Sequence, residues 1–302
     1  MPALLLAILL LLFLPSQALA WGIGVHLQLG SQALESLSRL PATLQPLLSA
    51  HPYDFLYGFI SADITLGKKY THYLKHCHSW RIGKEILAAA RTHSQRACAY
   101  GYLGHLAADT VAHSYMVPFK MIRTFNTTML KHFYWEMRFE SRVPPEIWQL
   151  ARTVARRDFR ANDTMMSGVL SRTLFSFSTN KRVFNSLLLL SRVQRWQGML
   201  QSLGEQSKYT LDEESLQDYL LLAREATESV LTHMENSPYW KADPAGERAI
   251  YAAGILRKNL NLLWLDGKLP EAEAQRLLRQ LKQRFRQGIT NPESLLDLLA
   301  GY

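Results

Sequence analysis

The chain has 302 residues, of which 48% are hydrophobic and 20% are charged. This composition excludes an intrinsically disordered chain, and its two cysteines exclude a disulfide-dense scaffold. The formal net charge of +9 favours anionic partners such as a phospholipid surface or nucleic acid, and the length allows one large core or two domains.

Residues 1–20 have the features of a secretory signal peptide. They carry no charged side chain, are mostly apolar from Leu4 to Leu14, and end in the small-residue pattern Ala18-Leu19-Ala20. This run is shorter than the roughly 20 residues that span a bilayer. We therefore expect cleavage after Ala20 and export to the periplasm or the extracellular space; an uncleaved anchor is the alternative.

Cleavage at this point would make Trp21 the first residue of the mature chain, shortly before His26. A free α-amine has an ordinary pKa near 7.7–8.0, so a nearby cation can hold it neutral as a ligand. The amine and carbonyl of Trp21 could chelate one metal ion together with His26. Alternatively, Trp21 could simply anchor the terminus in the core.

Histidines are concentrated in the first half of the chain. Nine of the ten lie between His26 and His132, interleaved with Asp63, Asp109 and Glu136. Isolated histidines are ordinary core or surface residues, but histidine and carboxylate side chains together are the usual ligands of zinc. This region is therefore the candidate metal-binding part of the protein.

Two spacings within this region sharpen the prediction. His105, Asp109 and His113 recur at i, i+4 and i+8 of one predicted helix, and His132 and Glu136 repeat the i, i+4 pairing on another. The first and last of the three are ~12 Å apart along a helix, too far to share one ion. Asp109 lies midway, so the spacing predicts a bridging carboxylate and two or more metals. The alternative is a polar stripe facing solvent.

The remainder of the mature chain also has helical periodicity. Apolar residues recur three and four positions apart in two long runs, for example at Tyr219, Leu222, Ala223, Ala226 and Val230, and at Leu277, Leu278, Leu281 and Phe285. We therefore expect an all-α fold. A soft boundary near residues 204–212 separates region 21–204 from region 205–302, which either stands apart or packs onto the same domain.

In this order, the residues resemble those of the zinc-dependent phospholipase C family and of the related single-strand-specific zinc nucleases. The likeness extends from about Trp21 to Glu140. It is carried by Trp21 after an export signal, His26, Asp63 in Gly58-Phe-Ile-Ser-Ala-Asp63, a histidine near Cys77-His78-Ser-Trp80, the pair His105-x3-Asp109, His113, and the pair His132-x3-Glu136.

The resemblance implies an all-α catalytic region with a cleft for three zinc ions, of which two to three would be bound. By analogy the first ion would be held by Asp63, His78, His105 and Asp109. The second would be held by His113, His132 and Glu136, and the third by Trp21, His26 and the bridging Asp109. The implied reaction is phosphodiester hydrolysis by a zinc-activated water, with Asp63 as the candidate general base.

Some assignments stay open within this resemblance. His72 and His76 are alternatives to His78, which is chosen for its distance from Asp63 alone. His113 follows Asp109 by four residues, whereas the family usually has six with a proline between. The short gap between Trp21 and His26 is nuclease-like, whereas an acidic partner at position 136 is phospholipase-like.

The two cysteines adjoin predicted ligands, because Cys77 precedes His78 and Cys98 lies seven residues before His105. In an oxidising compartment they could form a disulfide that links the ligand loop to the ligand helix. Reduced, buried cysteines are the equal alternative.

The leading hypothesis is an exported phospholipase C-type hydrolase that releases diacylglycerol and a phosphorylated head group. Its partner would be a phospholipid or membrane surface, and no obligate protein partner is evident. A nuclease acting on single-stranded nucleic acid would use the same ligands. A non-catalytic metal-binding envelope protein is the third possibility.

Overall fold

The computed structural model describes residues 21–65, 77–127, 135, 138–170, 176–190 and 213–295. Every regular element in these ranges is helical, which confirms the all-α prediction. The predicted signal peptide, His72, His76, His132 and Glu136 lie outside the described residues. Among the helices that are described, each is too short or too polar to cross a membrane.

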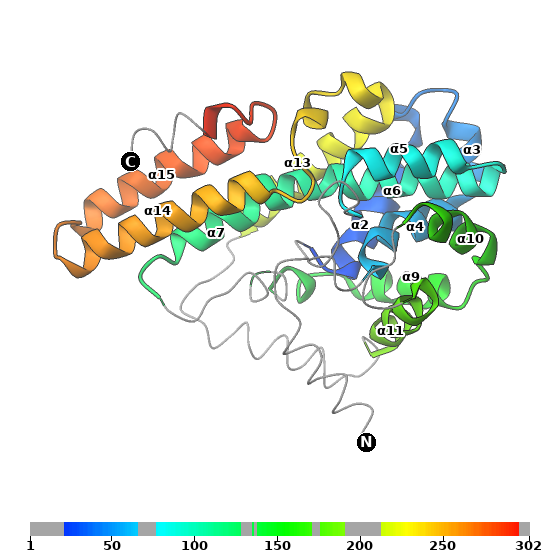
Figure 1. The fold of residues 1–302 in the computed structure, drawn as a ribbon, viewed down its shortest axis with the longest axis horizontal. Helices are drawn as coiled ribbons and strands as arrows, with labels where there is room; N and C mark the ends of the chain where they lie inside the picture. The colour runs from blue at the N-terminus through cyan, green and yellow to red at the C-terminus, as the bar shows by residue number, and fades with distance from the viewer. Residues whose placement is uncertain are drawn as a thin grey trace.

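The described elements follow one another along the chain, and Figure 1 shows their arrangement. In chain order they are α2 (Ile23–Glu35), η1 (Leu37–Arg39), α3 (Gln45–Ala50), α4 (Pro52–Ser61), η2 (Ala62–Ile64), α5 (Trp80–Ala89), α6 (His93–Val111), η5 (Ala112–Met116), α7 (Val117–Arg123), α9 (Pro145–Ala155), α10 (Arg160–Val169), α11 (Phe177–Leu190), α13 (Glu213–His233), η6 (Met234–Asn236), η7 (Pro238–Lys241), α14 (Glu247–Leu265) and α15 (Glu271–Gly288).

Helix α6 is the central element of the fold. It begins at a capping box in which the Thr92 side chain accepts a hydrogen bond from the Gln95 backbone amide, and the Gln95 side-chain oxygen accepts one from the Thr92 backbone amide. From Ala97 to Val111 nearly every residue is buried, because α4, α5 and α13 pack around it. A helix that is buried all round lies in the interior of its domain. Its polar residues are therefore carried into the core.

Helices α4 and α6 approach each other at backbone distance. A Cβ atom at Gly58 on α4 would lie 1.9 Å from the carbonyl oxygen of Cys98 on α6, so only glycine fits there. Asp63 follows Gly58 by about one and a half helical turns and lies on η2. The close approach therefore brings Asp63 to the side of α6.

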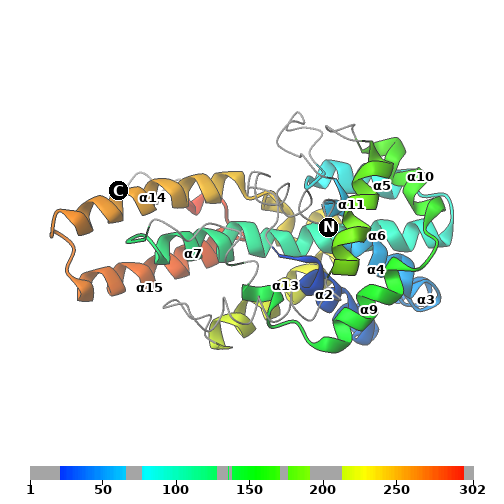
Figure 2. The same ribbon diagram turned by 90° about the horizontal axis from the view of Figure 1, so that it is seen from below.

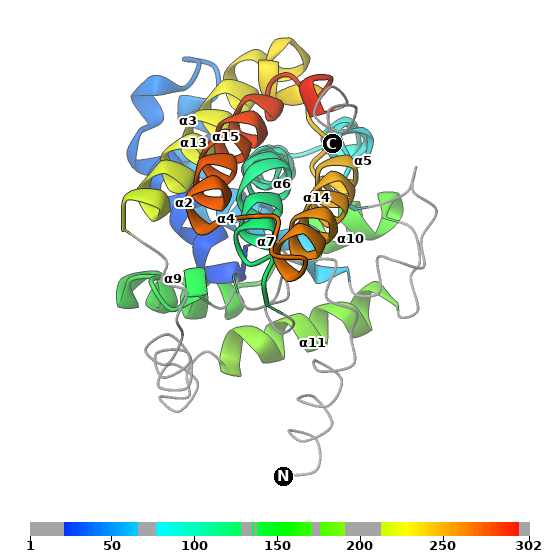
Figure 3. The ribbon, with the colours of Figure 1, turned by 90° about the vertical axis from the view of Figure 1, so that its left-hand side faces the viewer.

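A second part of the molecule extends away from this body. The backbone stays helical from α6 through the π-helical turn η5 into α7, and helices α14 and α15 form an antiparallel pair packed on α7. Figures 1 and 2 show the three helices α7, α14 and α15 as a projection to the left of the body, and Figure 3 shows them end-on in front of α6.

The C-terminal region begins in the body and continues in the projection. Helix α13 packs along α6 through buried residues that include Tyr219, Ala223 and Ala226, whereas α14 and α15 pack on η5 and α7. The boundary predicted near residues 204–212 falls outside the described residues. The division into two regions stays a prediction.

Candidate metal centre

The carboxylate of Asp109 lies at the centre of a buried cluster of histidines. Its Oδ2 atom is 3.1 Å from His78 Nε2 and 3.2 Å from His105 Nε2, and its Oδ1 atom is 3.3 Å from His26 Nε2. All four side chains are almost completely inaccessible to solvent. The structure thus brings together residues from α2, from the segment before α5 and from α6.

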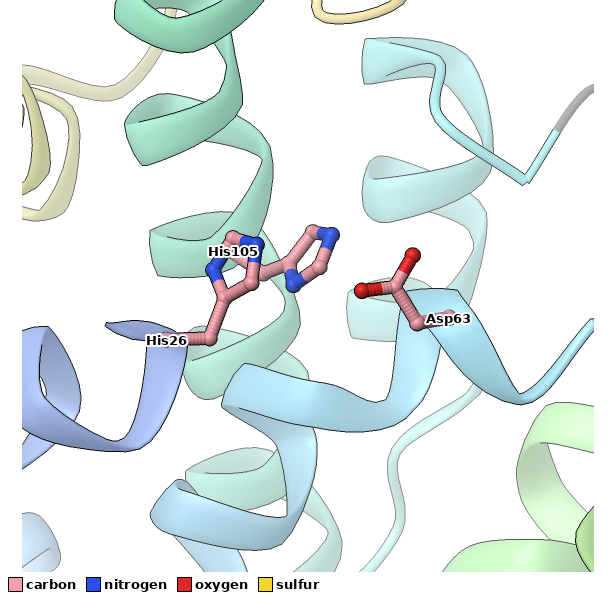
Figure 4. A group of neighbouring side chains, drawn as sticks. All are labelled: His26, Asp63 and His105. Carbon is pink, nitrogen blue, oxygen red and sulfur yellow. The ribbon is translucent and has the colours of Figure 1, made fainter. Parts of the chain in front are cut away.

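Asp63 adds a second carboxylate to this cluster. Its Oδ1 atom is 3.3 Å from His78 Nε2, and the residue is only 5% exposed. Figure 4 shows His26, His105 and Asp63 converging from α2, α6 and η2. Two groups have ligand atoms within 4.8 Å of one another and could each hold one ion: His26, Asp63 and His105, and His78, His105 and Asp109.

Neighbouring polar atoms hold the histidine rings so that their Nε2 atoms face the centre. His105 Nδ1 donates to the Phe59 carbonyl at 2.9 Å, and His78 Nδ1 contacts Cys77 Sγ at 3.3 Å. A carbonyl oxygen can only accept, so Nδ1 of His105 carries the proton and Nε2 presents a lone pair. The Nε2 atoms of His78 and His105 are 3.1 Å apart. This is the arrangement in which metal-binding histidines are held in proteins.

The charges of the cluster favour neutral histidine and ionised aspartate. Burial lowers the pKa of His105 below its ordinary value, and the neighbouring His26 lowers it further. Burial alone would raise the pKa of Asp109, but interaction with His105 and His113 outweighs burial and holds the pKa well below its usual range. A neutral imidazole and a carboxylate are the forms that bind a cation.

His26 provides the sharpest test of whether a metal fits. Its side chain is fully buried, and among the described residues neither ring nitrogen makes a hydrogen bond of ordinary geometry, although Nε2 lies 3.3 Å from Asp109 Oδ1. The ring stacks on His105, with centroids 3.9 Å apart and an interplanar angle of 18°. A buried polar group without a partner is costly unless something else satisfies it. The donor set around it, imidazole nitrogens and carboxylate oxygens, is that of zinc.

His113 lies at the edge of this cluster. It falls within the π-helical turn η5, and its Nδ1 atom is 3.9 Å from Asp109 Oδ2. His113 Nδ1 donates a hydrogen bond to the Pro244 carbonyl at 2.6 Å, so the proton of the ring is on Nδ1 and the lone pair is on Nε2. His113 belongs to neither three-residue group. Its predicted partners His132 and Glu136 lie outside the described residues, so this ligand set stays a prediction.

The turn before α14 forms the support for His113 and was not expected from the sequence. Gly246 adopts a left-handed conformation with φ +63°, and a Cβ atom there would lie 2.4 Å from His113 Cβ. Glycine is required on both counts. The contact spans 133 positions in the chain, so no local sequence pattern could have revealed it.

Trp21 and Glu140 organise the beginning of α2. Trp21 is fully buried, with its ring centroid 6.2 Å from that of His26. The Glu140 carboxylate accepts hydrogen bonds from the backbone amides of Gly24 at 3.2 Å and Val25 at 3.0 Å. It thereby occupies the amino-terminal end of a helix that has no side-chain cap of its own. The chelating role predicted for the Trp21 amine stays a prediction.

The two cysteines are not joined by a disulfide, so the predicted staple between Cys77 and Cys98 is not formed. The physical reason is that the two thiols lie in different surroundings. Cys77 Sγ contacts His78, whereas Cys98 is fully buried where α4 packs on α6. Burial, with the charges of Asp54 and Asp163, raises the pKa of the Cys98 thiol well above its usual value.

Comparison with known proteins agrees with this geometry. The family model for zinc-dependent phospholipase C matches residues 25–169, a range that contains all five residues of the buried cluster: His26, Asp63, His78, His105 and Asp109. No curated protein and no solved structure matches the chain. The family comprises hydrolases that act on phosphodiester bonds. Residues 25–169 are therefore similar to the zinc-dependent phospholipase C family.

Proposed function

We propose that the protein is a zinc-dependent phosphodiesterase that cleaves phospholipids in the manner of a phospholipase C, releasing diacylglycerol and a phosphorylated head group. The observation that most strongly supports this proposal is the convergence of three histidine Nε2 atoms on the buried carboxylate of Asp109, within 3.1–3.3 Å. The match of residues 25–169 to the family model supports the substrate class.

The clustered histidines and aspartates could hold at least one metal ion and would allow further ions. His105 Nε2 can bind only one ion, so the two three-residue groups that share it are alternatives for that atom. We assign it to a site with His78, Asp109 and Asp63, because its Nε2 atom is 3.2 Å from Asp109 Oδ2. His26 would then serve a second ion through Asp109 Oδ1, together with Trp21. A third ion would use His113 with His132 and Glu136.

Zinc bound at this cluster would act as a Lewis acid toward a phosphoryl oxygen and lower the pKa of water toward 7. The chain's own residues would then position the reactants and move the proton. Asp63, which lies on η2 beside His78, would accept a proton from the attacking water. The water oxygen bonds to phosphorus, the bond from phosphorus to the glycerol oxygen breaks, and that oxygen takes a proton from solvent.

Burial of the cluster strengthens each of these charge interactions. Asp109 is 1% exposed and His105 is 0% exposed, so their charges act in a medium of low polarisability. The family match and the apolar residues 1–20 also support our proposal that the protein is exported to the periplasm or the extracellular space.

The test begins with elemental analysis of protein purified after export, with its native amino terminus. Two to three zinc ions per chain are expected. The same protein should release phosphorylated head groups from phospholipid vesicles. Release of nucleotides from single-stranded nucleic acid, without lipid hydrolysis, would assign a nuclease instead. Bound zinc with neither reaction would remove the enzyme proposal and leave a metal-binding protein.

A further inference from the structure

Helix α14 carries an apolar stripe on the face that points away from the rest of the molecule. Five residues recur at alternating spacings of four and three, which places them on one helical face: Tyr251, Ile255, Lys258, Leu262 and Leu265. We name this set the α14 stripe. Tyr251 is 68% exposed, Leu262 is 51% exposed and Leu265 is 72% exposed, and Leu263 beside them is 40% exposed.

The α14 stripe is separate from the face of α14 that packs in the core. The inward face of α14 is a different set of residues, which are buried: Ala249, Ala252, Ala253, Leu256 and Leu260. Helix α14 is therefore apolar on two sides, one packed on α7 and η5 and the other exposed. Single exposed leucines are common, but several exposed apolar side chains on one helical face mark a contact surface.

We propose that the α14 stripe docks onto the surface of an anionic phospholipid bilayer. The charge of helix α14 supports this occupant. Residues 247–265 contain three Lys and Arg against one Glu, a net +2. Lys258 lies within the stripe itself. Apolar side chains flanked by basic ones are the combination that binds an anionic membrane interface.

The same charge argues against a second copy of the chain as the occupant. Antiparallel pairing of two stripes would bring two positively charged helices together and place Lys258, at the middle of each stripe, near its counterpart. An anionic bilayer has the opposite charge. Its interface also suits an exposed aromatic side chain such as Tyr251.

The stripe is connected through Gly246 to His113, at the edge of the candidate metal centre. Helix α14 starts directly after Gly246, which packs against His113, and its 19 residues extend ~27 Å from that point. Figures 1 and 2 show α14 running outward along α7 from the body. Docking through α14 would therefore hold the body at the lipid surface. This role rests on the proposed function, because it supplies the phospholipid on which the centre would act.

The first test measures binding of the full-length mature protein to vesicles of phosphatidylcholine with phosphatidylglycerol by co-sedimentation. The double variant Leu262→Ser and Leu265→Ser should bind about tenfold more weakly or worse. The matched control is Leu221→Ser on α13, a leucine 48% exposed outside the stripe, which should bind as the unaltered protein does. Equal loss in both variants, or no loss in the double variant, would overturn the proposal.

The second test concerns charge. Lys258→Glu should weaken binding to these vesicles roughly tenfold. Added salt should reduce the difference in vesicle affinity between this variant and the unaltered protein, because salt screens the charges. Arg182→Glu on α11, an exposed cation elsewhere, is the control and should have little effect. Light scattering completes the series. A dimer that dissociates in the leucine double variant would identify the stripe as a dimer interface and overturn membrane docking.

Failure of docking and failure of the proposed reaction give different results. The double variant should hydrolyse a monomeric short-chain phospholipid normally and vesicle lipid slowly. Hydrolysis of both at the normal rate would overturn docking and leave the phospholipase intact. Stripe-dependent vesicle binding without hydrolysis of either lipid would retain docking and remove the phospholipase.

Discussion

The body around α6 and the projection of α7, α14 and α15 depart from ordinary packing in opposite ways. In the body, polar side chains are buried, because His26, His105 and Asp109 are almost inaccessible within an apolar core. In the projection, apolar side chains are exposed along α14. Each departure costs folding free energy when the protein is alone.

This contrast indicates where each region meets a partner. Buried imidazole and carboxylate groups are stabilised when a cation joins them, and exposed leucines are stabilised when an apolar surface covers them. Among the contacts that join the two regions, that of Gly246 with His113 lies nearest the cluster. Substitutions that affect one region and spare the other therefore test the comparison.

The largest expected effect is that of Asp109→Asn. Asparagine keeps the size but removes the charge that lies 3.1–3.3 Å from three histidine nitrogens, so more than one metal equivalent should be lost. Hydrolysis should fall roughly 100-fold or more, because Asp109 is a direct ligand in the proposed site. Elemental analysis and a lipid hydrolysis assay measure both quantities.

The control for this substitution is Asp163→Asn on α10. Asp163 is also partly buried and accepts hydrogen bonds from Tyr57 and Lys181, but it lies in neither candidate metal group. It should keep its metal. Vesicle binding through α14 should survive in both variants. Full metal content in Asp109→Asn would exclude the bridging role.

Local spacing predicted the ligands within one helix better than those between helices. The i, i+4 relation of His105 and Asp109 follows from helical geometry, and their nitrogen and oxygen atoms are 3.2 Å apart. His26, Asp63 and His78 were proposed from their order along the chain, which gives no distances. The structure adds that His26 stacks directly on His105. A single sequence carries no signal for such a contact.

The supporting contacts were not predicted because they depend on backbone atoms and distant segments. The Phe59 and Pro244 carbonyls orient histidines, yet any residue could supply a carbonyl. Of the two alternatives for the cysteines, the structure has the free, buried thiols, because nearness in sequence to two ligands does not bring two thiols together. Periodicity predicted helices in the C-terminal region, but a pattern that is apolar on two sides does not say which side is buried.

The link between the two regions can be tested at two glycines. Gly246→Ala places a methyl group against His113 in a left-handed conformation and should destabilise the protein by about 1–3 kcal/mol. Gly254→Ala, on α14 itself, meets no atom within 4 Å and should stabilise by up to about 1 kcal/mol. Denaturant unfolding measures both values. If both substitutions changed the free energy of unfolding in the same direction, the tight contact at His113 would be contradicted.

The smallest expected effect is that of Glu140→Gln. The amide oxygen can still accept a bond from Gly24 or Val25, but the negative charge at the start of α2 is lost, so stability should fall by about 0.5–2 kcal/mol. Because α2 carries His26, metal content should also fall by part of one equivalent. Glu35→Gln, at the carboxyl end of the same helix, is the control. It should leave metal content unchanged, since a carboxylate there does not support the end that holds His26. Equal metal content in both variants would mean that Glu140 stabilises the helix without positioning the histidine.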